Sequence, residues 1–104
     1  MIKHIVFLAF AENIADAQIQ QTLTKLGNLR HKEIPQIKSF SAGKNISPEQ
    51  LSHGFNYVFT MEFANEKDRD MYLANEAHQL IAKNEILPLL ANGINSAIII
   101  DYKV

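Results

Sequence analysis

The stretch that decides the fold runs from Gly54 to His78 and reads GFNYVFTMEFANEKDRDMYLANEAH. In its first part, an aromatic or sulfur-containing side chain occupies every second position from Phe55 to Phe63. Alternation with a period of two among residues that favour β-structure predicts a strand with one strongly apolar face. This aromatic run is therefore first of all an element of the core.

The second part of the same stretch predicts a broken helix. Asn65 is a suitable N-cap, and the acidic residues that follow it complement the helix dipole in the first turn. Asn75 and Glu76 then interrupt the helical pattern between Tyr72 and His78. The phenol and the imidazole on either side of this turn are the pair of side chains best suited to chemistry.

Toward the N-terminus, the chain predicts a strand and then an amphipathic helix. The strand over 2–10 is apolar on both faces, so neither face is suited to water. The helix begins near 13–15 without a strong cap, and its apolar residues recur at helical spacing. One stripe of this helix is expected to be buried, namely Ile19, Leu23, Leu26 and Leu29.

Pro35 separates that helix from a second strand over 37–45, which is more polar and is expected at a sheet edge. A turn-rich loop then leads to Gly54. The strand is expected to place Phe40 and Ala42 on one face and Ile37, Ser39 and Ser41 on the other.

The C-terminal part predicts one more helical segment and a last strand. The segment over 77–87 is expected to end at Pro88, which cannot continue a helix. Its apolar positions are Leu80, Ile81 and Leu87. The last strand covers about 96–103, and its three consecutive isoleucines predict burial on both faces, at Ile98, Ile99 and Ile100.

The element order is βαββαβ in a single domain of residues 1–104, without a repeat or a linker. This order is typical of the α+β, ferredoxin-like fold, in which an antiparallel four-stranded sheet has its helices on one side. Two helical stripes cover only one face of such a sheet, whereas the first, third and last strands are predicted to be apolar on both. The uncovered face needs a partner, and we expect a homodimer with two sheets packed face to face.

Composition limits the classes of function. The 104 residues are 47% hydrophobic and carry ten Lys and Arg against eleven Asp and Glu. Because no basic surface follows from this balance, no nucleic-acid partner is expected. The apolar run over 5–10 is too short for a membrane span or a signal peptide, so no membrane partner is expected. The absence of cysteine excludes disulfides and sulfur-ligated metals, and it agrees with a cytoplasmic protein.

Six features of the chain form a set: Met1–Val6, Ile34–Lys38, Gly43–Asn45, Gly54–Val58, the spacing from Tyr72 to His78, and Asp101–Tyr102. As a set, they resemble the stress-responsive A/B barrel (Dabb) family over nearly the whole chain. The resemblance implies a dimeric α/β barrel of ferredoxin-like topology. The family includes plant stress proteins, bacterial members without an assigned activity, and the plant olivetolic acid cyclase, which closes a polyketide ring without a cofactor.

The resemblance also implies a site. The catalytic tyrosine and histidine of that cyclase fall on Tyr72 and His78, and a further pocket histidine falls on His4. An aldol ring closure needs a base for an acidic proton and a donor for the developing oxyanion, and these side chains can supply both without a metal or a cofactor. The implied pocket lies between sheet and helices, with a lining of His4, Val6, Leu8, Leu23, Leu26, Phe59, Leu73, Ile81 and Leu89.

Two departures from the family change what this resemblance implies. The family commonly has His-Pro-x-His before the second half of the broken helix, whereas the segment Asn75–His78 keeps only the last histidine. The cyclase has aromatic side chains on the first helix, where this chain has Leu23, Leu26 and Gly27. A pocket of different size and shape is therefore expected, and the substrate of the cyclase is not transferred.

Two classes of function remain open, so whether the chain is an enzyme is undecided. In the first, the dimer binds a small apolar or aromatic metabolite and Tyr72 and His78 perform proton-transfer chemistry on it. In the second, the chain is a structural or stress-related interaction protein, in which these two side chains and His4 are satisfied structural groups. A cofactor-free monooxygenase is supported by the architecture alone. His31 and His53 are expected to be solvated rather than metal ligands.

Overall fold

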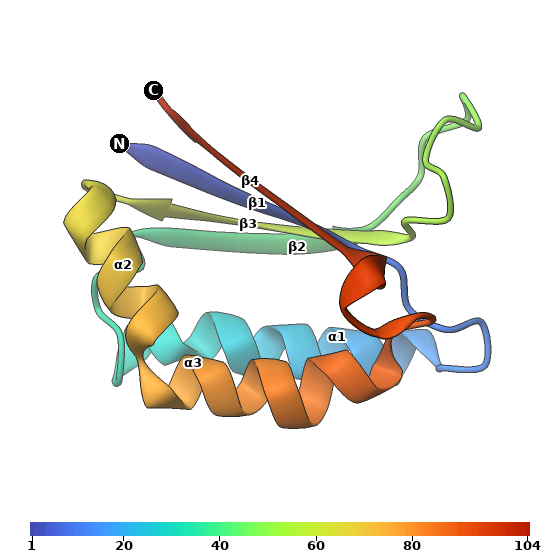
Figure 1. The fold of residues 1–104 in the computed structure, drawn as a ribbon, viewed down its shortest axis with the longest axis horizontal. Coiled ribbons are helices and arrows are strands. Elements are labelled where there is room, and N and C mark those ends of the chain that lie inside the picture. Colours follow the sequence, from blue (N-terminus) through green and yellow to red (C-terminus); the bar gives the residue numbers. More distant parts are fainter.

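In the computed structural model, which describes residues 1–104, a four-stranded antiparallel sheet is covered on one face by helices (Figure 1). The strands lie in the order β2-β3-β1-β4, so β2 is at the edge where it was predicted. The order confirms the ferredoxin-like α+β topology. The strands are β1 (Ile2–Leu8), β2 (Ser39–Lys44), β3 (Tyr57–Phe63) and β4 (Ala97–Lys103).

The first helix, α1 (Asp16–Gly27), begins as predicted without a side-chain cap, because the side chain of Ala15 has no atom that can accept a hydrogen bond. Asp16 lies in the first turn and Lys25 in the last, and both charges complement the helix dipole. The predicted apolar stripe is buried against the sheet, and a short 3-10 turn (Asn28–His31) continues it.

The predicted broken helix consists of α2 (Glu66–Ala74) and α3 (Glu76–Ile81). The side chain of Asn65 caps α2 by accepting a hydrogen bond from the Asp68 amide at 2.9 Å. Asn75 ends α2 and caps α3, because its side chain accepts a hydrogen bond from the Ala77 amide at 2.8 Å. A π-helical turn (Ala82–Ile86) and a 3-10 turn that contains Pro88 (Leu87–Leu89) extend α3.

The core lies between the sheet and the helices. The alternating side chains of β3 on this side are all buried, and both Met61 and Phe63 are 0% exposed. Gly27 permits a close approach of α1 to β2, since a Cβ atom at this position would lie 2.3 Å from the ring of Phe40. The fold therefore requires a residue without a side chain at the end of α1.

Two side chains near strand ends lie elsewhere than predicted. Phe55 precedes β3 and lines a groove on the opposite face of the sheet, and unlike Tyr57 it is not part of the buried core. Ile37 precedes β2 and is buried in the core instead of sharing the open face with Ser39. Both residues lie outside the paired ladder, where the alternation between faces is not imposed.

The predicted burial on both faces is wrong for two strands of the single chain. Ile98, Ile99 and Ile100 are 40%, 58% and 51% exposed, because β4 is an edge strand that the helices cover only in part. The open face of β3 is also less apolar than predicted, since it presents Thr60 and Glu62.

The segment from α3 onward differs from the prediction as well. Leu80 and Leu87 are 49% and 38% exposed, whereas Ile81 and Ile86 are buried. Leu80 and Ile81 are consecutive residues of α3 and point in different directions, so only one of them faces the core. Leu87 follows the π-helical turn, which shifts the phase of the helix.

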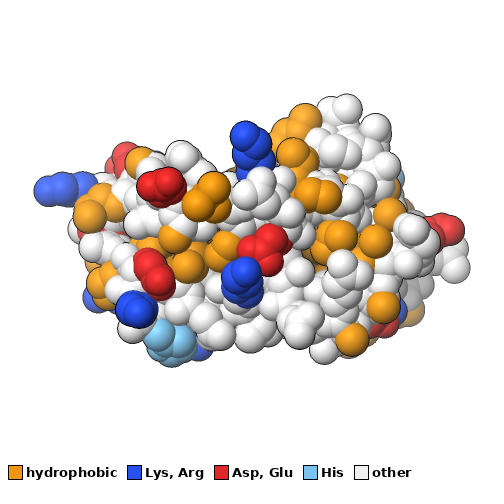
Figure 2. Space-filling model, turned by 90° about the horizontal axis from the view of Figure 1, so that it is seen from below, with side chains coloured by type: hydrophobic (Ala, Val, Ile, Leu, Met, Phe, Trp, Pro, Cys, Tyr) orange, Lys and Arg blue, Asp and Glu red, His pale blue; other side chains and the backbone are white.

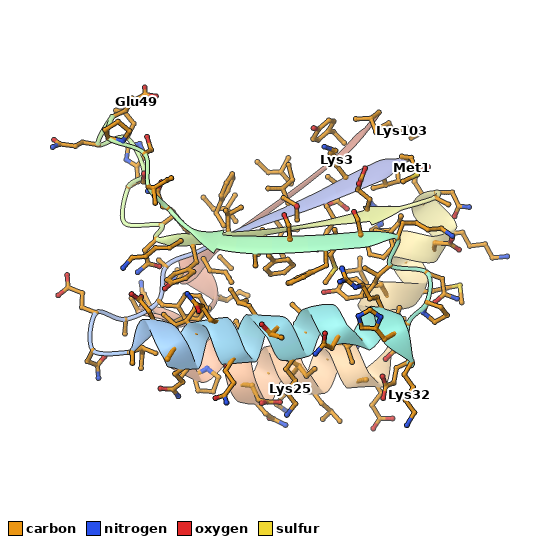
Figure 3. All side chains as sticks on the ribbon, turned by 180° about the vertical axis from the view of Figure 1, so that it is seen from behind. Met1, Lys3, Lys25, Lys32, Glu49 and Lys103 are labelled. Carbon is orange, nitrogen blue, oxygen red and sulfur yellow. The ribbon has the colours of Figure 1, made fainter.

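Residues 45–56 form an arm that projects from the sheet on the side away from the helices (Figures 1 and 3). Glu49 lies near its tip (Figure 3). The arm exposes two large apolar side chains, Ile46 at 91% and Leu51 at 67%. An exposed apolar arm beside an uncovered sheet face marks this side of the molecule as a contact surface.

Candidate functional site

A cavity of about 150 Å³ lies between the sheet and the helices, where the resemblance implies a pocket. Its wall is apolar except for the imidazoles of His4 and His78 and the phenol of Tyr72. A concave apolar space with a few converging polar groups is the usual form of a small-molecule site.

The structure brings most of the expected lining residues together. Leu23 and Ile81 are buried in the core but lie outside the wall, and Leu89 is half-buried outside it. Those that do line the cavity are His4, Val6, Leu8, Leu26, Phe59 and Leu73.

Other lining residues were missed. Ile99 could have been found, because it pairs with Val6 across the β1–β4 ladder and must therefore face the same side. Ala97 could have been found in the same way, because it pairs with Leu8 in the same ladder. The others lie in the irregular helical turns between α3 and β4, whose pitch the sequence does not reveal. The missed residues are Ala82, Ile86, Leu87, Leu90, Ile94, Ala97 and Ile99.

The break at Asn75 brings Tyr72 and His78 together. Six residues along one continuous helix would separate the two side chains by about 240° around its axis. Instead, Asn75 takes an extended conformation, with φ -69° and ψ 130°, and α3 starts in a new direction. As a result, the two rings lie against each other, with centroids 4.1 Å apart and planes at 34°.

Each ring of this pair carries a buried polar atom without a hydrogen-bond partner in the protein. These atoms are the phenolic oxygen of Tyr72 and Nδ1 of His78. Burial raises the pKa of the Tyr72 phenol, which therefore stays protonated and can donate. Burial lowers the pKa of the His78 imidazole, against the effect of the neighbouring Leu73 and Tyr72 backbone, and nearby His4 lowers it further. At neutral pH, His78 is thus a neutral imidazole that can accept a proton.

The third polar group of the wall, His4, is part of a connected hydrogen-bond network. His4 and Asp101 are direct partners in the β1–β4 ladder, and Nδ1 of His4 lies 2.7 Å from the Asp101 carboxylate. The other oxygen of this carboxylate accepts a hydrogen bond from Arg69 on α2 at 2.8 Å. The sequence reasoning found His4 but missed both partners.

A larger groove, of about 460 Å³, lies between the arm and the open face of the sheet. It is far from Tyr72 and His78, and it contains none of the predicted site residues. Its wall is mostly apolar and includes Phe7, Leu51, Phe55, Val58 and Ile98.

Charged groups elsewhere do not gather into a second site. On the helical face, acidic and basic side chains are scattered among apolar ones (Figure 2). No three His, Asp or Glu side chains converge in a way that could hold a metal ion. His31 and His53 are both exposed. None of the helices has the length and apolar character needed to cross a bilayer.

These features define a ferredoxin-like α+β domain with an apolar pocket between sheet and helices and an open sheet face on which β1 and β4 expose apolar side chains. Comparison with known families identifies it more closely. The family model of the stress responsive A/B barrel domain, Dabb, matches residues 2–104. The chain belongs to this family, as its sequence motifs indicate.

Individual relatives agree with this assignment. The stress-response A/B barrel domain-containing protein HS1 of Arabidopsis thaliana is 26% identical over 102 residues, which are 98% of this chain and 88% of that protein. A dimeric ferredoxin-like protein of unknown function from Jannaschia sp. is 25% identical, with a TM-score of 0.86 over 99% of this chain and 98% of that one. The hydroxynitrile lyase from Passiflora edulis shares the fold, with a TM-score of 0.84 at 23% identity over 99% of this chain and 92% of that one.

Proposed function

We propose that this chain binds a small, neutral, apolar or aromatic metabolite beside Tyr72 and His78, and that the polar side chains of this pocket perform proton-transfer chemistry on it without a cofactor. The observation that carries the proposal is the pair of unpartnered buried polar atoms on two rings that line an otherwise apolar cavity. A buried polar group without a partner costs about 1–3 kcal/mol. A ligand that supplies an oxygen and a proton to this pair offsets that cost.

The volume and the polarity of the cavity limit the ligand. An engineered cavity of comparable volume, lined by apolar side chains, binds benzene, so a single-ring compound is the appropriate size. The wall contains no carboxylate, and both oxygens of the nearby Asp101 are engaged. A neutral compound with one carbonyl or hydroxyl oxygen therefore suits the site.

The proposed chemistry follows from the protonation states. The Tyr72 phenol donates a hydrogen bond to a carbonyl oxygen and stabilises negative charge that develops there. A neutral imidazole takes a proton from the carbon next to that carbonyl. Ring closure, condensation and isomerisation of carbonyl compounds all begin with this step.

We further propose that two copies pack through their open sheet faces. The apolar residues of that face, the exposed arm and the groove of about 460 Å³ lie on the same side of the molecule, and the relative from Jannaschia sp. is dimeric. Sedimentation at micromolar concentration should show a dimer, and Ile100→Glu should yield a monomer. Thr24→Glu, on the exposed side of α1, is the matched control and should leave the dimer intact.

A ligand screen tests the pocket. Melting temperatures are measured against small neutral aromatic ketones and phenols for the wild type, Tyr72→Phe and His78→Asn. A compound present at a hundred times its dissociation constant adds about 2.7 kcal/mol of stability, which shifts the melting temperature measurably. We expect hits whose shift is lost in both variants. Tyr102→Phe on the open face and the exposed His53→Asn on the arm are the controls, and both should keep the shift.

One observation favours a second candidate, in which the dimer itself is the function and the pair is architectural. The Tyr72 oxygen and Nδ1 of His78 are covered by protein atoms, so a ligand reaches them only after a small side-chain movement. A screen without hits, together with strong destabilisation of both variants, supports this candidate and overturns the pocket proposal.

A further inference from the structure

We propose that His4 is the proton acceptor of this pocket and that Asp101 and Arg69 are positioning residues that fix its tautomer. The inference rests on the proposed function, because it names the base for the same cavity. It departs from the family resemblance, which implies Tyr72 and His78 as the acting pair.

The geometry forms a chain from solvent to the cavity. Arg69 donates from Nη1 to one oxygen of Asp101 at 2.8 Å, and the other oxygen lies 2.7 Å from Nδ1 of His4. The side chains of Arg69 and Asp101 are each 21% exposed, whereas that of His4 is 3% exposed. Arg69 is itself held from a second side, since its Nε donates to Asp70 at 2.9 Å.

This chain determines which nitrogen of His4 carries the proton. A guanidinium stays protonated in proteins, and the carboxylate that pairs with it can only accept hydrogen bonds. Nδ1 of His4 must therefore be the donor. The neutral imidazole then carries no proton on Nε2, which has no hydrogen-bond partner in the protein and belongs to a side chain of the cavity wall.

His78 lacks such an arrangement. Its Nδ1 has no hydrogen-bond partner, and no carboxylate bonds its ring. Tyr72 lies between the two histidines, with its ring centroid 4.1 Å from that of His78 and 5.7 Å from that of His4. The titratable and charged groups that face His4 are thus Asp101 from β4, Arg69 and Tyr72 from α2, and His78 from α3.

The step requires a neutral ketone or aldehyde with a hydrogen on the carbon next to its carbonyl. That C–H bond breaks, its proton forms an N–H bond with Nε2 of His4, and its electron pair moves onto the carbonyl oxygen. Tyr72 donates a hydrogen bond to this oxygen, and Asp101 offsets the charge of the imidazolium. Return of the proton to the product restores neutral His4, so no oxidant, reductant or metal takes part.

The tautomer is tested first, without a ligand. In ¹⁵N NMR spectra of the whole protein at neutral pH, we expect a pyrrole-type Nδ1 and a pyridine-type Nε2 for His4. Asp101→Ala and Arg69→Met should each convert this pattern into a mixture of tautomers. Arg30→Met is the matched control and should leave it unchanged. A proton on Nε2 in the wild type, or an unchanged pattern in Asp101→Ala, overturns the positioning role.

Proton transfer is tested with acetophenone, whose methyl hydrogens are followed by NMR as they exchange with D₂O. The wild type should accelerate the exchange, and His4→Gln should lower the rate by about 100-fold or more, the contribution typical of a general base. Asp101→Ala should lower it by a smaller factor. The assignment is overturned if the wild type and His4→Gln exchange the methyl hydrogens at the same rate. It is also overturned if His78→Asn loses the acceleration of exchange while His4→Gln keeps it in full.

Failure of this inference is distinguishable from failure of the proposed function. If acetophenone raises the melting temperature but its methyl hydrogens do not exchange faster, His4 is not the base, and the pocket proposal stays in place. If no compound of the screen binds, the proposed function fails, and the base assignment fails with it.

Discussion

The two faces of the sheet are built from the same strands but differ in how far their side chains are buried. On the helical side, Tyr57 and Phe63 of β3 are buried, and His4 of β1 lies within a closed aromatic cluster. On the other side, Phe7 of β1 is 36% exposed, and Ile100 of β4 is 51% exposed. Alternation along a strand decides which residues share a face, but the elements packed on that face decide whether they are buried. We therefore place the ligand on the covered face and the partner subunit on the open one.

The largest expected effect contrasts two phenylalanines of opposite faces. Phe63→Ala should lower the free energy of unfolding by about 3–5 kcal/mol, because it leaves a cavity in a fully packed core. Phe7→Ala should cost less and should shift the monomer–dimer equilibrium toward the monomer. Urea denaturation and sedimentation measure the two quantities. If both variants lower the free energy of unfolding by the same amount and Phe7→Ala leaves the dimer unchanged, the two faces do not differ in the way proposed.

Two glycines sharpen the comparison further. Gly27→Ala should destabilise the protein by about 1–3 kcal/mol, because the added Cβ would lie 2.3 Å from the Phe40 ring on the covered face. Gly43→Ala in β2 is the control, since nothing lies within 4 Å of its Cβ. Urea denaturation should show little change for it. A cost at Gly43 as large as that at Gly27 would mean that close packing is not the cause.

A smaller effect is expected at the turn that assembles the site. Asn75→Ala should lower stability by about 1 kcal/mol, because α3 loses the side-chain cap on the Ala77 amide. The stack of Tyr72 on His78 should loosen as well, which ring-current shifts in NMR spectra would report. Asn84→Ala, at an exposed helical position without a cap, should be neutral. The same loss in both variants would show that capping is not responsible.

The smallest effect is a pH dependence that the covered face creates. Because burial lowers the pKa of His78 in the folded protein from its ordinary value of 6.5, the unfolded chain binds a proton more readily. Stability should therefore fall as the pH drops from about 6.5 through the lower folded pKa, and it should be constant above this window. Urea denaturation across this range should show the dependence in the wild type and in His53→Asn, but a weaker one in His78→Asn. If the slope of stability against pH is unchanged in His78→Asn, the pH dependence arises from other titratable groups.

Local patterns in the sequence predicted most of the fold. Alternation predicted β3, and the largely apolar run over 2–10 predicted β1. The cap residue Asn65 and the interruption at Asn75 predicted the two parts of the broken helix, and the polar second strand was placed correctly at an edge. The exposure of β4 could not be predicted from its own residues, since it depends on how far the helices extend over an edge strand. The phase of the turns after α3 was hidden for a similar reason, because a π-helical turn leaves no clear mark in the sequence.

The polar residues of the candidate site could be predicted from the sequence, but the hydrogen bonds that connect them to other residues could not. Tyr72, His78 and His4 came from the family resemblance, and the structure places all three around one cavity. The link from His4 to Asp101 spans 97 residues, and it exists only because β1 and β4 pair in one particular register. Arg69 reaches the same carboxylate from a helix, which no pattern within that helix indicates.

The central claim is that the ligand belongs to one face of the sheet and the partner to the other, and three consecutive isoleucines test it most directly. Ile99 lines the cavity, whereas Ile98 and Ile100 alternate with it onto the open face. With ¹³C-labelled isoleucine methyl groups, we expect acetophenone to shift the Ile99 signal alone and dilution of the dimer to shift those of Ile98 and Ile100. Ligand shifts at Ile98 and Ile100 without one at Ile99, or a dilution shift confined to Ile99, would contradict the account.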